Sequence, residues 1–566
     1  MGTTFDATTI DDALADLSAG ERTWAATPLR ERAELLDQIH KRTGRFAADW
    51  VRAARAVKDL PEDSPLVGEE WMSGPMTLLQ ATAALADTLR KLDAGRSPLD
   101  GVTLGSAPGG RVSVPILPLD LYDRLLLSGF SGEVWLRPGV DEATARRDAG
   151  LAQRDPAQTG GIGAVLGAGN ITSIPPLDTL YELFAHNRVV ALKLNPITDP
   201  LFTVFEMVFA PLIELGVVRI LLGGAEEGGY LVRHPLVAHA HMTGSAQTHD
   251  AIVWGTGAEG TANKKAGTPL LDKPITSELG GVSPTLVVPG EWSDADLAFQ
   301  AAHIATQRLH NGGYNCVAAQ AVVIAADWPQ RDRFLDELRT ALELAPQRTP
   351  YYPGSDKRVA DALAAYPAAE RLGQGRVLVE GVPPAESPLL NTEYFSPVLG
   401  VVELPGRGGE FLHRAVDFAN AELTGTLGAN VLAQPAVIRR LGTAFDRALE
   451  RLRYGAIAVN AWTGLAFLAP RASWGAYPGH TLDDVQSGIG VVHNAFLLDH
   501  VERTVVRGPF RPAPRSLLAG EPALSPKPPW FVDNATAAET GRKLTEFYAG
   551  RDPLRLPGLF LSAFRG

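Results

Sequence analysis

The sequence predicts an α/β protein in which helices cover mostly parallel sheets on both faces. Short apolar runs recur from about residue 160, among them GAVLGAG, VVALKL and VVRILLGG, and stretches of helical length separate them. Strand, helix and strand in that order form right-handed βαβ units. The alternation resumes after Gly281 with PTLVVPG and AQAVVIA. We therefore expect two α/β layers, the first with nucleotide-binding architecture.

Composition excludes several classes of function. The chain has 566 residues, 45% of them apolar, which is enough for several packed domains and rules out intrinsic disorder. With 52 basic and 64 acidic residues the net charge is −12, so nucleic acid is not an expected partner. One cysteine cannot form an intrachain disulfide. The first twenty residues lack signal-peptide features, and no uninterrupted apolar run approaches the ~20 residues of a membrane span. A cytoplasmic location without membrane contact is predicted.

The first part of the chain divides into helices and a strand-rich segment. Residues 1–110 are predicted to be the helical N-terminal part of the cofactor-binding domain, including a helix from about Pro75 to Leu92. The segments 111–119 and 132–139 alternate like strands. We therefore assign 111–159 to a strand-rich arm or bridge.

The rest of the chain is divided by the apolar alternation. Residues 160–279 are predicted to form a Rossmann-like cofactor-binding domain, and 280–500 a catalytic α/β domain. Clustered prolines in 501–566 indicate an extended wrapping or oligomerisation tail with one helix, Ala537 to Tyr548. The segment 255–267 is interpreted as an inserted loop.

Three side chains stand where chemistry can occur. Cys316 follows the glycine-containing turn HNGGYNC, and although a lone cysteine is most often buried and structural, this turn could present a thiol to a cleft. Glu278 precedes two glycines, which lets another group approach the backbone closely. Asn170 closes an apolar strand, where its amide could donate to an oxyanion. Read singly, Glu278 could be a surface residue and Asn170 a turn residue.

Taken together, these residues resemble the aldehyde dehydrogenase superfamily. The resemblance covers roughly 160–500 and rests on six motifs in the same order: Asn170, Lys193, Gly244-Ser245, Glu278-Leu-Gly-Gly, Asn311-x-Gly313-x-x-Cys316 and Glu393-x-Phe395-x-Pro397-Val398. It implies an aldehyde dehydrogenase-like fold with a cofactor domain, a catalytic domain and a small oligomerisation arm. In this family the arm adds a strand to a neighbouring sheet, so a homodimer or tetramer is expected.

The resemblance implies a two-step oxidation. Cys316 would attack the aldehyde carbon, and the Asn170 amide with the Cys316 backbone N–H would stabilise the oxyanion. After hydride transfer to a nicotinamide, Glu278 would activate the water that hydrolyses the thioester. The product would be a carboxylic acid.

The resemblance also implies NAD or NADP as cofactor. Seven residues would hold it: Lys193 at the adenosine ribose, Gly224 and Gly229 in a turn beneath the adenine, Gly244 and Ser245 at the diphosphate, and Glu393 and Phe395 at the nicotinamide riboside. Pro196 stands where the family usually has a glutamate that clasps the adenosine ribose. Without that carboxylate, NADP is at least as plausible as NAD.

Two alternative functions remain open, one within the same fold and one because the chain departs from the family pattern at Tyr314 and at Ser473-Trp474. One is a CoA-acylating aldehyde dehydrogenase or acyl-CoA reductase, against which Glu278 argues. The other is a catalytically inactive scaffold or binding protein. No metal site is predicted, because His239 and His241 alternate on a strand without a third convincing ligand. The aldehyde itself is left open.

Overall fold

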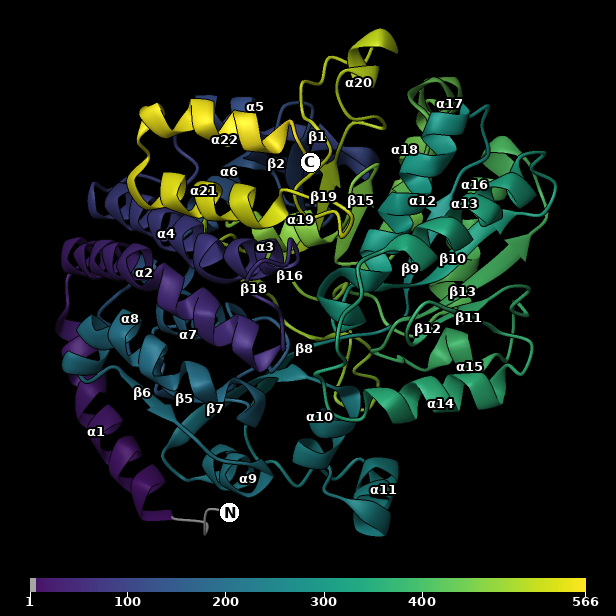
Figure 1. Cartoon of the computed structure of the whole chain (residues 1–566). Coiled ribbons are helices and arrows are strands. Elements are labelled where there is room, and N and C mark those ends of the chain that lie inside the picture. The colour runs from purple at the N-terminus through teal and green to yellow at the C-terminus, as the bar shows by residue number, and fades with distance from the viewer. Residues whose placement is uncertain (1–6) are drawn as a thin grey trace.

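The computed structural model describes residues 7–566, and in that range the chain is built on two main sheets (Figure 1). The two sheets account for the α/β class that the apolar alternation predicts. A third, two-stranded ribbon pairs β16 (Ser473–Trp474) with β18 (Val492–His493).

The six-stranded sheet has the order β17-β8-β7-β4-β5-β6, and only β17 runs antiparallel to its neighbour. Its strands are β4 (Ile162–Leu166), β5 (Val189–Lys193), β6 (Val218–Leu221), β7 (Val237–Gly244), β8 (Ile275–Leu279) and β17 (Gly488–Ile489). The helices that connect them are α7 (Ile174–Ala185), α8 (Phe202–Glu214), α9 (Ala225–Arg233) and α10 (Ala246–Val253). This is the βαβ pattern expected for 160–279.

The second sheet has eleven strands in the order β1-β2-β3-β19-β15-β14-β9-β10-β13-β12-β11. From β19 to β12 all pairs are parallel. The strands of this parallel part are β9 (Ser283–Val287), β10 (Ala319–Ala325), β12 (Arg376–Val379), β13 (Val398–Leu404), β14 (Gly428–Leu432), β15 (Ala456–Val459) and β19 (Val501–Arg507), with β11 (Glu370–Leu372) at the edge. Helices over this sheet include α12 (Asp294–Leu309), α13 (Arg331–Leu344), α14 (Ser355–Ala365), α16 (Gly408–Glu422) and α18 (Thr443–Arg451).

The strand-rich arm joins the sheet of its own chain. It contributes β1 (Gly105–Ala107), β2 (Arg111–Leu117) and β3 (Ser131–Leu136), and β3 pairs antiparallel with β19. On its other side β19 pairs with β15, so both edges of β19 are occupied within one chain. The expected addition of an arm strand to a neighbouring sheet is therefore not what these strands do here. The first residues of the predicted tail are a central strand of this sheet.

Helices before and after the sheets pack together. The N-terminal ones are α1 (Ala7–Ala26), α2 (Leu29–Val57), α3 (Val67–Trp71) and α4 (Thr77–Asp93), and α3 joins α4 through a π-helical turn at Met72–Met76. The tail adds α20 (Arg515–Leu518), α21 (Ala537–Gly550) and α22 (Leu556–Ala563), and α21 packs on α3 and α22. Figure 1 shows α21 and α22 in yellow beside α4.

Two expectations about irregular segments were wrong. The tail has three helices instead of one. The segment predicted as an inserted loop contains helix α11 (Gly257–Ala266), in which only Gly260 is buried. Because α11 has almost no apolar face, the periodicity that reveals a core-facing helix is missing from its sequence.

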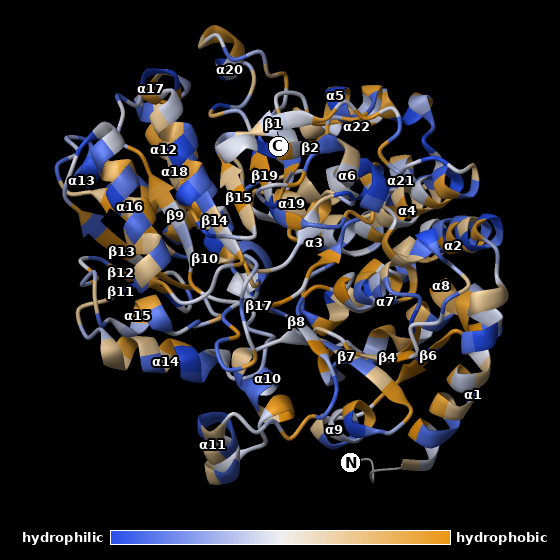
Figure 2. Ribbon diagram, turned by 180° about the vertical axis from the view of Figure 1, so that it is seen from behind, coloured by the Kyte–Doolittle hydropathy of each residue, from blue (hydrophilic) through white to orange (hydrophobic). Residues whose placement is uncertain are grey.

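The parallel strands form the centre of both layers. All five residues of β5 and all seven of β10 are buried, because helices cover both faces of each sheet. Figure 2 shows these strands mainly in the hydrophobic colour, with hydrophilic residues along the outer helices.

One segment, Pro196–Glu214, is long and apolar enough to cross a membrane by length and composition. Our sequence analysis did not single it out. Its helical part, α8, packs between α2 and β6, as the core helix of a folded domain does.

Candidate active site

The site lies where the chain crosses from one sheet to the other. Strand β8 ends at Leu279, Gly280 and Gly281 follow, and β9 begins at Ser283 in the second sheet. A Cβ built on Gly281 would lie 2.9 Å from the Cα of Gly425, so this crossing needs a residue without a side chain. Glu278, the last residue but one of β8, is thereby held at the junction, with 3% of its surface exposed.

Cys316 meets Glu278 at this junction. Its thiol is a free, half-buried group beside Glu278, and Oε1 of Glu278 is buried without a hydrogen-bond partner. Burial raises the pKa of Glu278 to about 8. Burial and the neighbouring Glu278 carboxylate raise the pKa of the Cys316 thiol well above its ordinary value. The two residues therefore form an acid–base couple in which each controls the charge of the other.

The turn before Cys316 is pinned in place, whereas the sequence suggested a flexible one. Asn311, Gly312 and Gly313 all have positive φ, from 55° to 82°. The Asn311 side chain donates to the carbonyl oxygens of Asn170 and Tyr314, both at 3.1 Å. It also accepts hydrogen bonds from Lys58 Nζ and Tyr351 Oη, both at 3.0 Å. These bonds hold a strained turn in one conformation.

A buried cluster of charged side chains supports the same turn. No motif in the sequence predicts this cluster. Lys58 Nζ lies 2.7 Å from Glu70 Oε1, and both side chains are at most 1% exposed. Glu69 Oε2 lies 2.7 Å from Arg348 Nη2 and accepts the backbone N–H of Asn311 at 3.1 Å. Removing one member would leave an uncompensated buried charge, so the cluster fixes α3 against the cysteine turn.

Asn170 lies beside the turn, and a hydrogen bond to the turn restrains its side chain. Its side-chain Nδ2 donates to the carbonyl oxygen of Tyr314 at 2.9 Å, two residues before Cys316. Its own carbonyl accepts from Asn311 and Tyr351. One N–H of the Asn170 amide is thus used for positioning, which leaves the other for an oxyanion.

A buried histidine and aspartate lie behind Glu278. In the β7–β8 pairing, His241 is opposite Thr276 and Thr243 is opposite Glu278. His241 Nε2 lies 3.4 Å from Asp178 Oδ2 of α7, and Thr243 donates to the same oxygen at 2.8 Å. Burial alone would lower the pKa of His241, but Asp178 and, further off, Glu182 and Glu278 raise it above its ordinary value. The sequence analysis explained His241 by strand packing and so did not assign it this place beside Glu278.

His239 takes part in a second buried contact. Its Nδ1 lies 3.4 Å from Glu182 Oε2. Among residues 7–566, no group of three or more histidine, cysteine, aspartate or glutamate side chains has the arrangement of a metal site.

A small apolar pocket lies on one side of the thiol. It is lined by Cys316 with aromatic and aliphatic side chains, chiefly Met72, Ile171, Trp462, Phe467, Leu468, Trp474 and Trp530. The lining contains no aspartate, glutamate, lysine or arginine. Trp462, Phe467 and Trp474 come from the stretch that runs from β15 to β16 through a short helix, and they supply the aromatic wall beside the thiol.

Glu393 approaches the thiol from the second sheet. A Cβ on Gly280 would lie 1.9 Å from Glu393 Oε1, which shows how closely this carboxylate crosses the junction. Oε1 is buried without a hydrogen-bond partner, and burial raises the pKa of Glu393 to about 7. An unpartnered acceptor at this place fits a ribose hydroxyl donor.

Phe395 lies beside the same region. Its ring is 4.9 Å from Tyr352 and 6.0 Å from Tyr314, centroid to centroid. Tyr314, which departs from the family pattern two residues before Cys316, is therefore part of an aromatic cluster beside Phe395. Packing in this cluster explains why an aromatic side chain fits at position 314.

Lys193 ends β5 and is buried, which lowers its pKa. Two carboxylates missed by the sequence analysis, Asp199 and Glu227, face it, and Asp199 Oδ1 is buried without a partner. Lys193 thus has acidic neighbours although Pro196 replaces the usual glutamate. The usual glutamate is absent at Pro196, as the sequence indicates, and Asp199 is a different carboxylate that interacts electrostatically with Lys193.

The predicted glycine turn is only partly a turn. Gly224 is the N-cap of α9, and its N–H donates to Glu227 Oε2 at 2.7 Å. Gly229, in contrast, lies inside α9, so the expectation of a turn there was wrong. Within α9 the glycine beside the Lys193 side chain is Gly228, whose added Cβ would lie 4.0 Å from the Lys193 Cδ.

The predicted diphosphate contact is at a helix start. Gly244 ends β7, and Ser245 is the N-cap of α10, where its Oγ accepts the N–H of Thr248 at 3.1 Å. The first backbone N–H groups of a helix carry positive partial charge and favour an anion. Lys193 is the last residue of β5 and Ser245 directly follows β7, so both lie at the carboxyl ends of parallel strands, where dinucleotides bind. Glu393 comes from the segment before β13.

Comparison with known sequences identifies what this chain resembles. The Aldehyde dehydrogenase family model matches residues 172–356. The chain is 25% identical over 304 residues to D-glyceraldehyde dehydrogenase (NADP(+)) of Picrophilus torridus, covering 49% of this chain and 54% of that protein. It is 28% identical over 267 residues to succinate-semialdehyde dehydrogenase [NADP(+)] 1 of Mycobacterium tuberculosis, covering 43% and 51%. The chain spans about half the length of the curated relatives it matches.

Solved structures show the same fold over most of the chain. An aldehyde dehydrogenase from Mycobacterium tuberculosis, complexed with NAD+, aligns with a TM-score of 0.59 at 17% identity over 88% of this chain and 89% of that one. A putative aldehyde dehydrogenase from Burkholderia cenocepacia aligns with a TM-score of 0.57 at 19% identity over 88% and 91%.

Proposed function

Because the chain is a distant member of the aldehyde dehydrogenase superfamily, we propose that it oxidises an aldehyde to a carboxylic acid with NAD+ or NADP+. The observation that carries the proposal is the contact between Cys316 and Glu278 at the sheet junction. Glu278 belongs to β8 of the six-stranded sheet and Cys316 lies in the segment that leads into β10 of the other sheet, so their meeting is a property of the folded chain.

The chemistry begins at the sulfur. Glu278 takes the thiol proton of Cys316, and the thiolate forms a C–S bond to the aldehyde carbon, giving a thiohemiacetal. The remaining amide N–H of Asn170 and the Cys316 backbone N–H stabilise the oxyanion. A nicotinamide dinucleotide, when bound, would supply the acceptor for the hydride, and the carbon would remain on Cys316 as a thioester. Glu278 passes the thiol proton to solvent and then removes a proton from water, whose oxygen bonds to the acyl carbon while the C–S bond breaks, which releases the carboxylic acid and the Cys316 thiolate.

The residues around the junction fit the dinucleotide. Glu393 would accept from the nicotinamide ribose, Phe395 would pack beside the ring, and Ser245 with the start of α10 would face the diphosphate. Lys193 would contact the adenosine ribose at the end of β5.

Water is favoured over CoA as the acyl acceptor. A thiol acceptor needs no hydrolytic base, whereas Glu278 is buried beside the reacting sulfur with a pKa of about 8. The same pair also argues against an inactive scaffold. Burying a carboxyl group destabilises the fold, and a protein without a reaction to perform would have no reason to keep one beside a thiol. The cytoplasmic location and the homo-oligomeric state stay predictions.

The test measures both steps of the reaction, the oxidation of the aldehyde to the thioester and the hydrolysis of the thioester. Wild type incubated with an aldehyde panel and NAD+ or NADP+ should produce reduced nicotinamide and free acid without CoA. Cys316→Ser should abolish both products, because a hydroxyl is a far weaker nucleophile. Glu278→Gln should leave thioester on Cys316, detected as an added acyl mass on the intact protein. A strict need for CoA would replace the proposal by the acylating alternative, and inertness towards the whole panel would favour the scaffold.

A further inference from the structure

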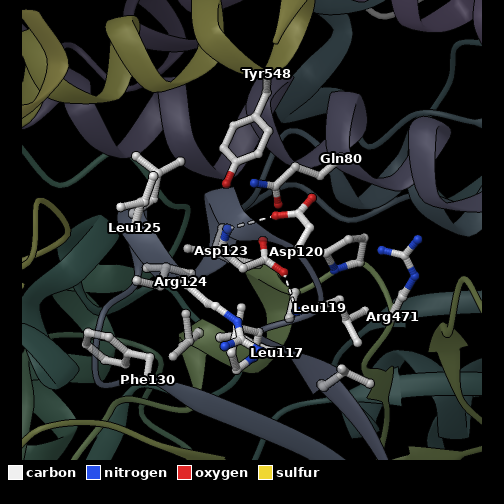
Figure 3. Close-up of a pocket in the computed structure, with 18 of the residues that line it drawn as sticks. Gln80, Leu117, Leu119, Asp120, Asp123, Arg124, Leu125, Phe130, Arg471 and Tyr548 are labelled. Atoms are coloured by element: carbon white, nitrogen blue, oxygen red, sulfur yellow. Dashed lines mark hydrogen bonds between the residues drawn. The ribbon is translucent and has the colours of Figure 1, made fainter. Parts of the chain in front are cut away.

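A cavity of about 990 Å³ lies apart from the cofactor residues, between the N-terminal helices, the arm and the tail. Its walls come from α4, β2, the short helix α5 (Leu121–Leu126) and the tail helices α21 and α22. Figure 3 shows Tyr548 projecting from above into this space toward Gln80 and Asp120. A cavity of this size is at the upper end of small-molecule sites.

The cavity is mainly apolar. Its lining includes aliphatic and aromatic side chains from every wall, among them Met76, Ala84, Leu117, Phe130, Leu544 and Phe560. Leu125 and Phe564, also in the lining, are 43% and 56% exposed. The entry of an apolar group into a space with such walls lowers the free energy, because apolar surface is removed from water.

The charged groups of the lining are largely occupied with one another. Arg471 Nη2 lies 3.3 Å from Asp87 Oδ2, and Arg551 Nη1 lies 2.8 Å from Asp120 Oδ2. Asp123 accepts the N–H of Leu119 at 2.8 Å, and burial raises the pKa of its carboxyl. These pairings give the cavity no surplus of one charge that would select an ionic ligand.

The cavity adjoins the pocket of the reactive thiol. Met72, Leu468 and Trp530 line both spaces and therefore form the boundary between them. Met72 comes from the π-helical turn before α4 and Trp530 from the tail, so this boundary is formed by parts of the chain outside residues 172–356 that match the family model. A molecule whose carbonyl reached Cys316 could extend past these three side chains into the cavity.

We propose that the substrate is an aldehyde with an extended apolar tail, whose carbonyl reacts at Cys316 while the tail passes Met72, Leu468 and Trp530 into the cavity beneath α21 and α22. This inference rests on the proposed function, since it names the substrate class of that site. A small hydrophilic aldehyde would leave the cavity filled with water and draw no binding energy from it.

The first test is the dependence of rate on chain length. For straight-chain aldehydes from propanal to dodecanal, kcat/KM should rise about fourfold per added methylene, the factor expected for burying one CH₂ group, until the cavity is filled. A flat or falling series with active short aldehydes would overturn the inference and leave the proposed oxidation standing.

Two substitutions on α22 form a matched pair. Ala563 lines the cavity, whereas Leu561 is 57% exposed and outside the lining. Ala563→Trp should lower kcat/KM for dodecanal at least tenfold and leave propanal unchanged, while Leu561→Trp should change neither. Ala84→Phe, on the opposite wall, should act like Ala563→Trp. Equal effects on both aldehydes from either cavity variant would contradict the inference.

A binding measurement separates the cavity from catalysis. The Cys316→Ser protein should bind 1-dodecanol at least tenfold more tightly than 1-hexanol in calorimetry, and Ala563→Trp should abolish that difference. Dodecanol binding in a protein inactive toward aldehydes would support the cavity and refute the proposed oxidation. Absence of binding would overturn the cavity inference whatever the activity.

Discussion

The charge of Glu278 determines the pH range in which the proposed reaction runs. Burial raises the pKa of Glu278 to about 8, so below that pH the carboxyl is mostly protonated and cannot act as a base. We expect kcat for hydrolysis to rise with pH through about 8 and then level off. A stopped-flow and steady-state pH profile measures this. A midpoint near 4.5, the ordinary value for glutamate, would show that the carboxyl is not held in a buried environment during turnover.

His241 should influence Glu278 without touching substrate, which makes it a positioning residue. Its partly positive ring lowers the pKa of Glu278, whereas the Asp178 carboxylate raises it. In His241→Asn, Asp178 is left uncompensated, so the pH midpoint of kcat should move upward from about 8. The added change Asp178→Asn should move the midpoint back down. A loss of kcat with an unmoved midpoint in the single variant would indicate that His241 acts only through packing.

The same residues show what sequence reasoning can reach. Cys316, Glu278 and Asn170 could be named because the family pattern fixes their order along the chain. Asp178 and His241 could not be tied to Glu278, since they meet it only through α7 packing over the β7–β8 pair. The cluster of Lys58 and Glu70 behind the cysteine turn is a long-range contact of the same kind.

At the scale of elements, strands were predicted more reliably than peripheral helices. The runs at β4, β5 and β10 are apolar throughout because helices cover both sheet faces, and such runs are visible in the sequence. Helix α11 buries only Gly260 and so has no apolar stripe to read. Gly229 was placed in a turn because GGAEEGG resembles the family's glycine turn beneath the adenine, yet α9 continues through it.

The turn after β5 should decide between the two dinucleotides. Asp199 lies near Lys193, where the resemblance places the adenosine ribose, and a 2′-phosphate would meet the repulsion of this carboxylate. Asp199→Asn should raise the ratio of kcat/KM for NADP+ to that for NAD+ about tenfold, as expected when about 1.4 kcal/mol of charge repulsion is removed.

The control for this change is Glu206→Gln, an exposed substitution on the following helix α8, which should leave the ratio unchanged. If the ratio of kcat/KM for NADP+ to that for NAD+ falls in Asp199→Asn, the Asp199 carboxylate does not repel the 2′-phosphate. It would instead orient Lys193 toward that phosphate.

Across the whole molecule, the arm closes the large sheet within one chain. Strand β19 has partners on both sides, and the edges of the sheet are the three-residue strands β1 and β11. Short edge strands offer few free backbone groups for pairing with a second chain. A homo-oligomer that forms by strand addition would therefore have to use one of these short edges, β1 of the arm or β11, a consequence of strand order that composition and spacing do not reveal.

The junction of the two sheets joins the cofactor side to the thiol, and Gly280 is its narrowest point. A methyl group here would collide with the Glu393 carboxylate, which is the end of a flexible side chain and can swing away, so Gly280→Ala should fold normally. Displacing an acceptor for the ribose should weaken binding of reduced dinucleotide about tenfold or more, measured by its fluorescence. Since Glu393→Ala removes the same acceptor, the double variant should bind no worse than the worse single one. Additive losses would show that Gly280 and Glu393 act on the cofactor separately and that the junction does not couple the sheets.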